Sequence, residues 1–317
     1  MTNIIEIQGL TKKYGELVAL DDLTLAIEEG AVFGFIGPNG AGKTTTMRIL
    51  TTLLKPTSGR AWVAGHSITD DPRGVRRVIG YMPDFFGVYE DMKVWEYLDF
   101  FAACYDIPTA TRVTMIDDLL ALVDLSHKRD EFVESLSRGM KQRLCLARTL
   151  AHDPKVLILD EPASGLDPRA RIEMRELLRE LKTMGKTIFF SSHILSEVAD
   201  ICTSIGIIEA GKLIASGDIN EMKRLLRAHR LIQVRVLGDL APLQEFLMRH
   251  QAVQGIATDA EMELPPGTVR FDFSGSDDEL SQLLHDLIQS GISVLSFHEE
   301  AGDLEDVFLR VTQGIVS

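Results

Sequence analysis

The chain has 317 residues, an apolar fraction of 45% and a charged fraction of 25%, which is typical of a globular protein of one or two domains. Its net charge of −14 argues against a nucleic-acid-binding protein, whose contact surface is basic. No stretch approaches the roughly 18 consecutive apolar residues that cross a bilayer, and we expect no secretory signal. Three widely spaced cysteines predict reduced thiols in the cytoplasm.

The first part of the chain combines predicted strands with a glycine-rich loop. Short strands are expected over residues 4–8 and 23–27, where apolar positions recur with the period of a strand. The unbroken apolar run 31–36 indicates a buried parallel strand, and apolar residues at helical spacing predict a helix over 45–54. The loop 37–44 therefore joins the end of a buried strand to the start of a helix.

This loop reads Gly-Pro-Asn-Gly-Ala-Gly-Lys-Thr and fits the phosphate-binding pattern Gly-x-x-x-x-Gly-Lys-Ser/Thr. Glycines let backbone N–H groups close around a phosphate chain, Lys43 would neutralise the β and γ phosphates, and the Thr44 hydroxyl would bind Mg²⁺. The helix directs its free amides and the positive end of its dipole at the anion. The residues predicted to bind the nucleotide are Gly37, Pro38, Asn39, Gly40, Ala41, Gly42, Lys43, Thr44 and Thr45.

Tyr14 lies upstream of this loop. Its ring could stack on the nucleotide base, a contact worth about 1–3 kcal/mol, although a tyrosine in a loop more often has a structural role. Downstream of the helix, a turn is expected at 56–59 and a strand over 60–64.

From residue 92 to about 151 the apolar periodicity becomes helical. We interpret residues 84–151, approximately, as a helical subdomain inserted between two halves of an α/β core. An aromatic cluster at its start is expected to be mostly core, with some rings at a partner surface. The cluster consists of Phe85, Phe86, Tyr89, Trp95, Tyr97, Phe100 and Phe101.

A second nucleotide motif follows this insertion. The continuous apolar run 156–159 ends in Asp160, Glu161 and Pro162. In phosphate-loop ATPases an Asp at the end of such a strand holds Mg²⁺ through water. Glu161 could orient and deprotonate a water for attack on the γ-phosphate. Solvated charges at a strand end are the structural alternative, which the complete phosphate loop upstream disfavours.

The core continues with an amphipathic helix over 171–184 that ends at Gly185. A buried strand is expected over 187–191, with His193 just past its end. At the C-terminal edge of a parallel sheet, beside the phosphate crevice, a histidine suits a catalytic role better than a packing role. A hairpin over 205–216 closes this part of the chain.

The pattern changes past residue 219, which predicts a first domain over 1–219, a basic helical connector over 220–230 and a second domain over 231–317. The order strand, helix, strand, strand, helix, strand indicates a small α+β, ferredoxin-like sandwich. Residues from 220 onward carry 8 Lys and Arg against 16 Asp and Glu. A dimer-stabilising appendage and a regulatory module both remain open for this domain. Its expected elements are 231–237, 241–250, 253–258, 268–273, 279–290 and 292–297, with a last helix over 304–311.

Between the two nucleotide motifs, Ser137 precedes a helix with an apolar face and forms a second anion-binding helix start. Two anion sites are unexpected if one ATP is held, unless the second serves the ATP of another copy. At this point the chain resembles the nucleotide-binding subunit of an ABC transporter. In that family two subunits face head to tail, with each ATP between one phosphate loop and the signature motif of the partner.

The resemblance covers residues 4 to about 219 and rests on six motifs in the order of the family. Tyr14 matches the base-stacking aromatic, and the phosphate loop matches Walker A. The run 156–160 matches Walker B, which makes Glu161 the catalytic base, and His193 matches the switch histidine. The resemblance further implies a signature motif, which binds the ATP of the partner copy, at Ser137, Arg138, Gly139 and Met140. It implies a D-loop at Ser164, Gly165, Leu166 and Asp167.

Two residues depart from the family pattern. Arg138 stands where the signature usually has its first glycine, so it either adds a positive charge near the anion or turns outward. Asp84 stands where the family has a glutamine that reaches Mg²⁺ and the attacking water. This shorter, anionic side chain could ligate Mg²⁺, directly or through water, or repel the γ-phosphate and slow hydrolysis. We expect ATP turnover to be retained.

The resemblance implies an α/β phosphate-loop ATPase domain with a mixed sheet, ATP and Mg²⁺ as cofactors, and a second copy or a homologous subunit as partner. The second domain resembles that of a bacterial branch whose partners are ABC-2-type permeases, contacted near residues 84–89. This implies a cytoplasmic subunit, peripheral on the inner face of the membrane, that powers an exporter. The alternative is a soluble ABC-type ATPase acting on ribosomes or DNA. A small-molecule kinase would leave the signature helix unexplained.

Overall fold

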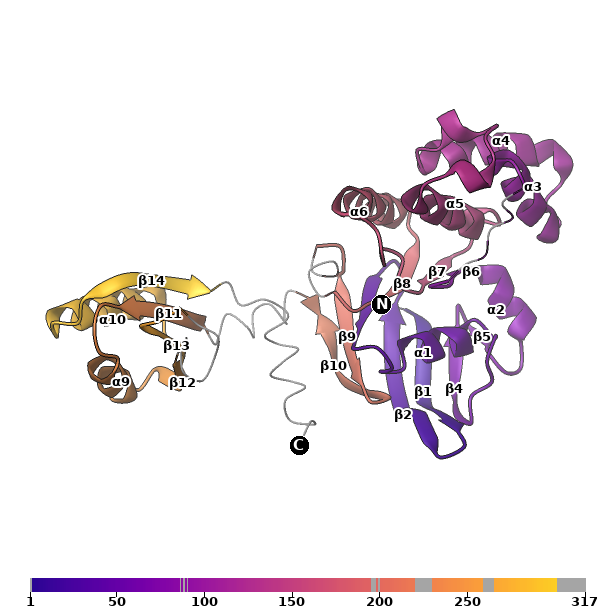
Figure 1. The fold of residues 1–317 in the computed structure, drawn as a ribbon. Helices are drawn as coiled ribbons and strands as arrows, with labels where there is room; N and C mark the ends of the chain where they lie inside the picture. The colour runs from indigo at the N-terminus through magenta and orange to yellow at the C-terminus, as the bar shows by residue number, and fades with distance from the viewer. Residues whose placement is uncertain are drawn as a thin grey trace. The chain divides into compact units, whose positions relative to one another are not determined.

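The computed structural model describes residues 2–85, 87, 89, 91–194, 198, 200–219, 230–258 and 265–300. The chain divides into two compact units, residues 1–219 and 220–317. Both units contain strands and helices, as Figure 1 shows. Within the described residues no helix is both long and apolar enough to span a membrane.

The centre of unit 1 is a six-stranded sheet in the order β10-β9-β3-β8-β7-β6. Neighbouring strands from β9 to β6 run parallel, and β10 pairs with β9 antiparallel. All residues of β3, β7 and β8 are buried, as expected for strands covered on both faces. Parallel strands end at one edge of the sheet, which places the loops after β3, β7 and β8 together. The strands are β3 (Val32–Ile36), β6 (Ile79–Met82), β7 (Val156–Leu159), β8 (Thr187–Ser192), β9 (Ser204–Glu209) and β10 (Lys212–Asp218).

A second, antiparallel sheet has the order β2-β1-β4-β5. Its strands are β1 (Asn3–Tyr14), β2 (Leu17–Glu28), β4 (Ser58–Val63) and β5 (His66–Ser67). Apolar residues of both sheets share one core with helix α1 (Lys43–Leu50), so the phosphate loop is anchored on either side. The short helix α2 (Pro72–Val78) was not predicted; Asp71 caps it by accepting a hydrogen bond from the Gly74 N–H at 2.9 Å.

Helix α1 ends at Leu50, four residues earlier than its apolar pattern predicts. Thr52 adopts a left-handed φ of 63°, and the N–H groups of Leu53 and Leu54 both turn back to the Arg48 carbonyl. This is the geometry of a helix C-terminus that satisfies its last carbonyls locally. The expectation of a helix to residue 54 is therefore wrong, and Leu53 is 64% exposed.

The helical subdomain gathers at one end of unit 1, where α3, α4 and α5 lie together (Figure 1). Its helices are α3 (Val94–Cys104), α4 (Thr109–Leu122) and α5 (Arg138–Leu150), with 3₁₀ turns at Ser126–Lys128 and Val133–Ser135. Helix α6 (Pro168–Thr183) follows β7 and buries its apolar face, which includes Met174 and Leu181.

The aromatic cluster divides between the core and the surface. Tyr97 is fully buried, whereas Phe85 is 89% exposed and Tyr89 and Phe100 are also exposed. Trp95 and Phe101 are half-buried, so the expectation that the cluster is mostly core is wrong for its described rings, while a partner surface for some of them stays a prediction. Phe86 lies outside the described residues.

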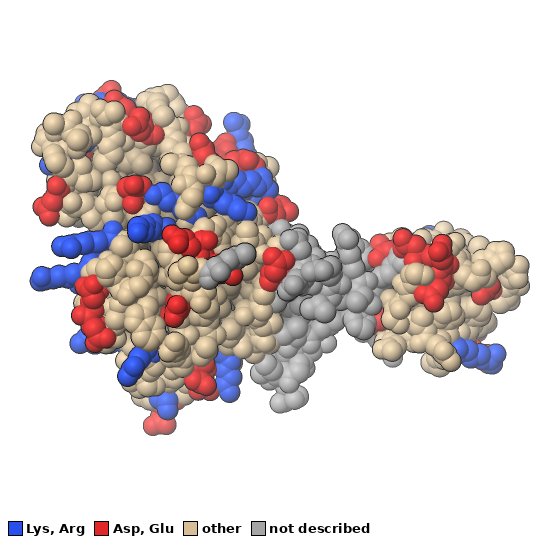
Figure 2. All heavy atoms as spheres, turned by 180° about the vertical axis from the view of Figure 1, so that it is seen from behind, with Lys and Arg blue, Asp and Glu red and all other residues tan. Residues whose placement is uncertain are grey.

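Unit 2 contains an antiparallel sheet in the order β12-β13-β11-β14. With two helices whose apolar residues share its core, this is a ferredoxin-like arrangement. On the face shown in Figure 2, acidic side chains gather on this unit and few basic ones accompany them. The expected helix over 304–311 and residues 220–229 of the expected connector lie outside the described residues, and residue 230 begins β11. The elements are β11 (Arg230–Val236), α9 (Ala241–Met248), β12 (Val253–Thr258), β13 (Thr268–Phe273), α10 (Asp277–Gln289) and β14 (Val294–Glu300).

Candidate active site

The loop 37–44 leads from β3 into α1 with two glycines in positions that no other residue could take without strain. Gly42 caps α1 with a φ of 111°, in the left-handed region. A Cβ on Gly37 would lie 2.2 Å from the backbone oxygen of Ile208 on β9. The backbone of the loop is therefore held close to the sheet, ahead of the free amides of the first turn of α1.

The Lys43 ammonium group lies inside the curve of this loop, and the residue is only 5% exposed. It donates hydrogen bonds to the backbone oxygens of Gly37, at 2.6 Å, and Pro38, at 3.2 Å. Its Nζ also lies 3.5 Å from Oε1 of Glu161, at the end of β7. The positive charge is thus held at the point where the loop amides would surround a phosphate chain.

Asp160 directly follows strand β7, and its carboxylate is almost fully buried. The Ser191 hydroxyl, on the neighbouring strand β8, donates to Oδ1 at 2.7 Å. Oδ2 is buried and has no hydrogen-bond partner among the described residues. A buried carboxylate oxygen without a partner is costly, so it indicates a place for a ligand such as a cation or its water.

Glu161 connects the loop 37–44 with the loop that follows β8. While Oε1 faces Lys43, Oε2 lies 2.8 Å from Nδ1 of His193, in the loop after β8. The glutamate backbone adopts a left-handed φ of 51°, a strained conformation for a residue other than glycine. Its N–H donates to Oγ of Ser191 at 2.8 Å, which helps to hold that conformation.

The cavity at this edge of the sheet has a volume of about 290 Å³. It brings together residues from four parts of the chain that are far apart in sequence, and one of them is the exposed Asp84. Its lining residues are Pro38, Asn39, Gly40, Ala41, Gly42, Lys43, Thr44, Thr45, Asp84, Glu161, Ser164 and His193.

The donor set fits Mg²⁺ bound with a nucleotide better than a resident metal centre. Thr44 and Asp160 offer hard oxygen ligands, and Mg²⁺ commonly keeps several waters while binding one or two carboxylates and substrate phosphates. The described residues contain no group of three or more His, Cys, Asp and Glu side chains able to hold a metal ion. The unpartnered Oδ2 of Asp160 is the observation that favours this site.

Several predicted site residues do not line this cavity, namely Tyr14, Gly37, Asp160, the signature residues and the D-loop residues Gly165, Leu166 and Asp167. Tyr14, at the end of β1, is 48% exposed and has the Lys12 ammonium 5.0 Å from its ring centroid. Ser137 caps α5 and accepts a hydrogen bond from the Met140 N–H at 3.3 Å, so the signature residues begin that helix. Neither Tyr14 nor the signature residues line the cavity within this copy of the chain.

The loop predicted as the D-loop runs from Glu161 to α6. Asp167 caps α6 by accepting from the Ala170 N–H at 2.9 Å, and Leu166 is buried. Ser164 lines the phosphate cavity, while Gly165 is exposed and adopts a φ of 66°. One short segment therefore touches both the cavity and the start of a helix.

Sequence reasoning missed Ser191 and Gln142. Ser191 connects Asp160 with the Glu161 backbone, and Gln142, buried in α5, donates to the Pro162 oxygen at 2.6 Å. A serine at the end of an apolar strand and a glutamine within a helix carry no motif signal of their own. The pairing of β7 with β8 brings Ser191 beside Asp160 and Glu161, and it becomes visible only in the fold.

We predict that Ser191→Ala lowers the turnover number for ATP by about 10- to 100-fold, because it releases both Asp160 and the strained Glu161 backbone. Steady-state ATPase assays would measure the loss. Thr149→Ala is the matched control. Within the described residues, its buried hydroxyl donates only to the Cys145 and Leu146 carbonyls of its own helix. Equal turnover in Ser191→Ala and the wild type would contradict a positioning role.

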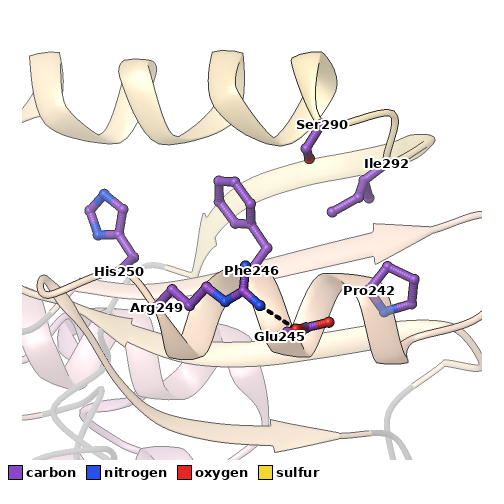
Figure 3. A pocket seen from close by; sticks show the side chains of 7 residues that line it. All are labelled: Pro242, Glu245, Phe246, Arg249, His250, Ser290 and Ile292. Carbon is purple, nitrogen blue, oxygen red and sulfur yellow. Dashed lines mark hydrogen bonds and ion pairs between the residues drawn. The ribbon is translucent and has the colours of Figure 1, made fainter.

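Unit 2 has a separate cavity of about 430 Å³ (Figure 3). Phe246 and Ile292 offer apolar surface, and Arg249 and Glu245 form an exposed ion pair beside it. None of the motif residues belongs to this cavity. Its lining residues are Pro242, Glu245, Phe246, Arg249, His250, Ser290 and Ile292.

Comparison with known proteins agrees with this geometry. The family model described as "ABC transporter" matches residues 20–164. The chain is 35% identical to the Nod factor export ATP-binding protein I of Ralstonia nicotianae, over 98% of this chain and 94% of that protein. It is also 35% identical to the bacitracin transport ATP-binding protein BcrA of Bacillus licheniformis, over 99% of each. The daunorubicin resistance ATP-binding protein DrrA3 of Streptomyces coeruleorubidus is 33% identical over 97% of this chain and 95% of its own length.

Solved structures give the same answer for unit 1. The structure of an ATP-binding subunit of an ABC transporter superposes with a TM-score of 0.64 at 30% identity, covering 71% of this chain and 93% of that one. A dimeric cassette in a post-hydrolysis state with ADP and Pi has a TM-score of 0.62 at 25% identity, covering 68% of this chain and 98% of that one. These matches, with the near full-length relatives, show that this chain belongs to the ABC transporter family, as one of its ATP-binding, ATP-hydrolysing subunits.

Proposed function

We propose that this chain is the motor subunit of an exporter and works as one half of a head-to-tail dimer. The single observation that carries the proposal is the position of Glu161 between Lys43 and His193 at the mouth of the phosphate loop. A carboxylate there can act on a water beside the terminal phosphate of a bound nucleotide. The names of the relatives, in Nod factor export, bacitracin transport and daunorubicin resistance, favour export. None of them favours an ATPase of ribosomes or DNA.

The residues divide the chemistry of ATP hydrolysis among them. The loop amides and Lys43 hold the phosphate chain, and catalysis in this class is mainly positioning and neutralisation of charge. Glu161 accepts the proton of the attacking water, and His193 orients the Glu161 carboxylate through Oε2. Mg²⁺ bound with ATP would neutralise charge on the phosphates, with Thr44 and Asp160 as its protein ligands and Asp84 as a further candidate.

The signature residues would complete the ATP site of the partner copy. They begin α5, whose free amides and dipole suit a phosphate, yet they do not line the phosphate cavity of their own chain. Two copies, or this chain and a homologous subunit, would then hold two ATP molecules between them. ATP binding would close the dimer and hydrolysis would open it, as a ligand-biased shift between two states.

A membrane permease would dock beside Asp84. Phe85 and Tyr89 are exposed there, and the Tyr89 ring packs edge-on against Phe100 at 5.5 Å. Exposed aromatic rings in a group are typical of protein interfaces. We infer an ABC-2-type permease as this partner, which would hold the subunit on the cytoplasmic face of the membrane and determine the cargo.

We predict that the subunit co-sediments with membranes when its permease is produced with it, and that Phe85→Glu reduces this association by at least about 10-fold. A charge at the centre of an aromatic contact would have to be buried unpaired. Quantitative immunoblotting of membrane and soluble fractions would measure it. The exposed Leu53→Glu, on the α1 side of unit 1, serves as the control. Membrane association that persists without any permease would contradict the proposal.

A further inference from the structure

Helix α5 is attached to the segment after Glu161 by two side chains, one helical turn apart. Gln142 donates to the backbone oxygen of Pro162 at 2.6 Å, and Arg138 donates through Nη2 to the backbone oxygen of Ser164 at 3.3 Å. Residues four apart lie on one face of a helix, so both donors reach the same stretch of chain. The glycine that the family usually has at position 138 could not make the second of these bonds.

The Arg138 guanidinium group occupies a space that Gly165 leaves open. A Cβ on Gly165 would lie 2.3 Å from Nη2, 2.4 Å from Cζ and 2.7 Å from Nη1 of Arg138. The planar group therefore lies directly over the Gly165 backbone. On the next position of α5, a Cβ on Gly139 would lie 3.0 Å from Cβ of Ala170, so the first turns of α5 and α6 are also in close contact.

The segment that Arg138 holds leads straight to the catalytic glutamate. Ser164 lines the phosphate cavity, and its N–H donates to the Glu161 backbone oxygen at 3.0 Å. A path of direct contacts thus runs from Arg138 to Ser164 and from Ser164 to Glu161. It connects the helix start predicted to meet the ATP of the partner with the active site of the same chain.

We propose that Arg138 is a positioning residue that couples the two ATP sites of the dimer. This inference rests on the proposed function and assigns Arg138 a role within it. When ATP of the partner seats against the start of α5, Arg138 holds Ser164 and Gly165, and through them Glu161, in the arrangement that hydrolyses the chain's own ATP. Coupling of this kind requires two sites and a shared element that responds to both.

The test compares Arg138→Ala with the wild type in steady-state ATPase assays. We expect the turnover number to fall at least about 5-fold, the Hill coefficient for ATP to approach 1, and KM to stay within about 2-fold. Arg138→Lys should recover part of the turnover, because an ammonium group can still donate to the Ser164 oxygen. Arg169→Ala is the control, since its side chain is 90% exposed on α6 and pairs with Glu173. An unchanged turnover number in Arg138→Ala would overturn the proposal.

Two further measurements separate positioning from a direct contact with the phosphate of the partner. In a Glu161→Gln background, Arg138→Ala should dimerise at the same Mg-ATP concentration within about 2-fold, and a large loss would instead assign Arg138 to phosphate binding. Gly165→Ala displaces the guanidinium group and also strains a backbone with a φ of 66°, so it should lower turnover at least as much as Arg138→Ala. Unchanged turnover in Gly165→Ala would overturn the coupling.

Amide hydrogen exchange of residues 163–166 in the isolated subunit gives a readout that needs neither dimer nor turnover. Loss of the Arg138 bond should speed exchange there several-fold, and unchanged exchange would contradict the contact itself. If exchange changes while the wild type neither hydrolyses ATP nor dimerises, the proposed function fails and the coupling fails with it. If the wild type hydrolyses ATP and the Arg138 variants behave like the wild type, the proposed function stands and this inference falls.

Discussion

Glu161→Gln should retain ATP binding while its turnover number falls by about 10²- to 10⁴-fold, the range that a general base contributes. Gln is nearly isosteric: its amide oxygen can accept from Lys43 while its amide N–H donates to Nδ1 of His193, so the cavity keeps its shape. What the variant loses is the carboxylate that takes the proton from water. Single-turnover assays with radiolabelled ATP would measure the chemical step, and equilibrium binding of a fluorescent ATP analogue would measure affinity.

Glu176→Gln is the matched control for this experiment. Its side chain is 61% exposed on α6 and pairs with Arg179, away from the phosphate cavity. Turnover within about 2-fold of the wild type is expected for it, as for most exposed substitutions. If Glu161→Gln hydrolysed ATP as fast as the wild type, Glu161 would have no role in the mechanism. Equal rates would also contradict the expectation that the wild type retains ATP turnover despite Asp84.

Lys43→Ala should reduce the affinity for ATP by at least about 10²-fold, because each hydrogen bond from a charged group contributes about 1.5–3 kcal/mol. The ammonium group is 5% exposed and bonds to Gly37 and Pro38, so its loss also leaves the loop carbonyls without their donor. Isothermal titration calorimetry with Mg-ATP would measure the change.

Lys212→Ala separates this effect from a general loss of positive charge. Lys212 lies on β10 with a side chain 62% exposed and pairs with Asp21, so its removal should leave ATP affinity unchanged within about 2-fold. Equal weakening by both substitutions would point to long-range electrostatics in this acidic protein. Affinity retained in Lys43→Ala would contradict the assignment of the loop 37–44 to phosphate binding.

The phosphate site could be predicted because its chemistry depends on residue types at fixed spacing. Gly37 to Thr44, Asp160 and His193 each follow a strand whose apolar run is visible in the sequence, and parallel strands must bring their ends to one edge. In unit 2 the strands 253–258 and 268–273 were predicted with their observed ends. There, a change from the period of a strand to that of a helix coincides with turn residues.

The rest could not be predicted because it depends on contacts between distant residues or on local backbone geometry. The role of Ser191 arises from the pairing of two strands, and the close fit of Arg138 over Gly165 arises from the approach of α5 to the next loop. The early end of α1 depends on a left-handed Thr52, a conformation that threonine rarely adopts. Residue type alone predicts that Phe85 and Tyr89 are buried, because aromatic side chains are mostly buried unless a partner covers them, whereas both are exposed.

The most direct test of the central claim is the mass of Glu161→Gln in solution, measured by light scattering with and without saturating Mg-ATP. We expect a shift from the 35.2 kDa of one chain to about twice that mass, reversed when ATP is replaced by ADP. Substituting Ser137 by bulky Phe should prevent the shift while leaving ATP bound to the loop 37–44. A Glu161→Gln protein that binds Mg-ATP at saturation and stays at the mass of a single chain would contradict the shared ATP site.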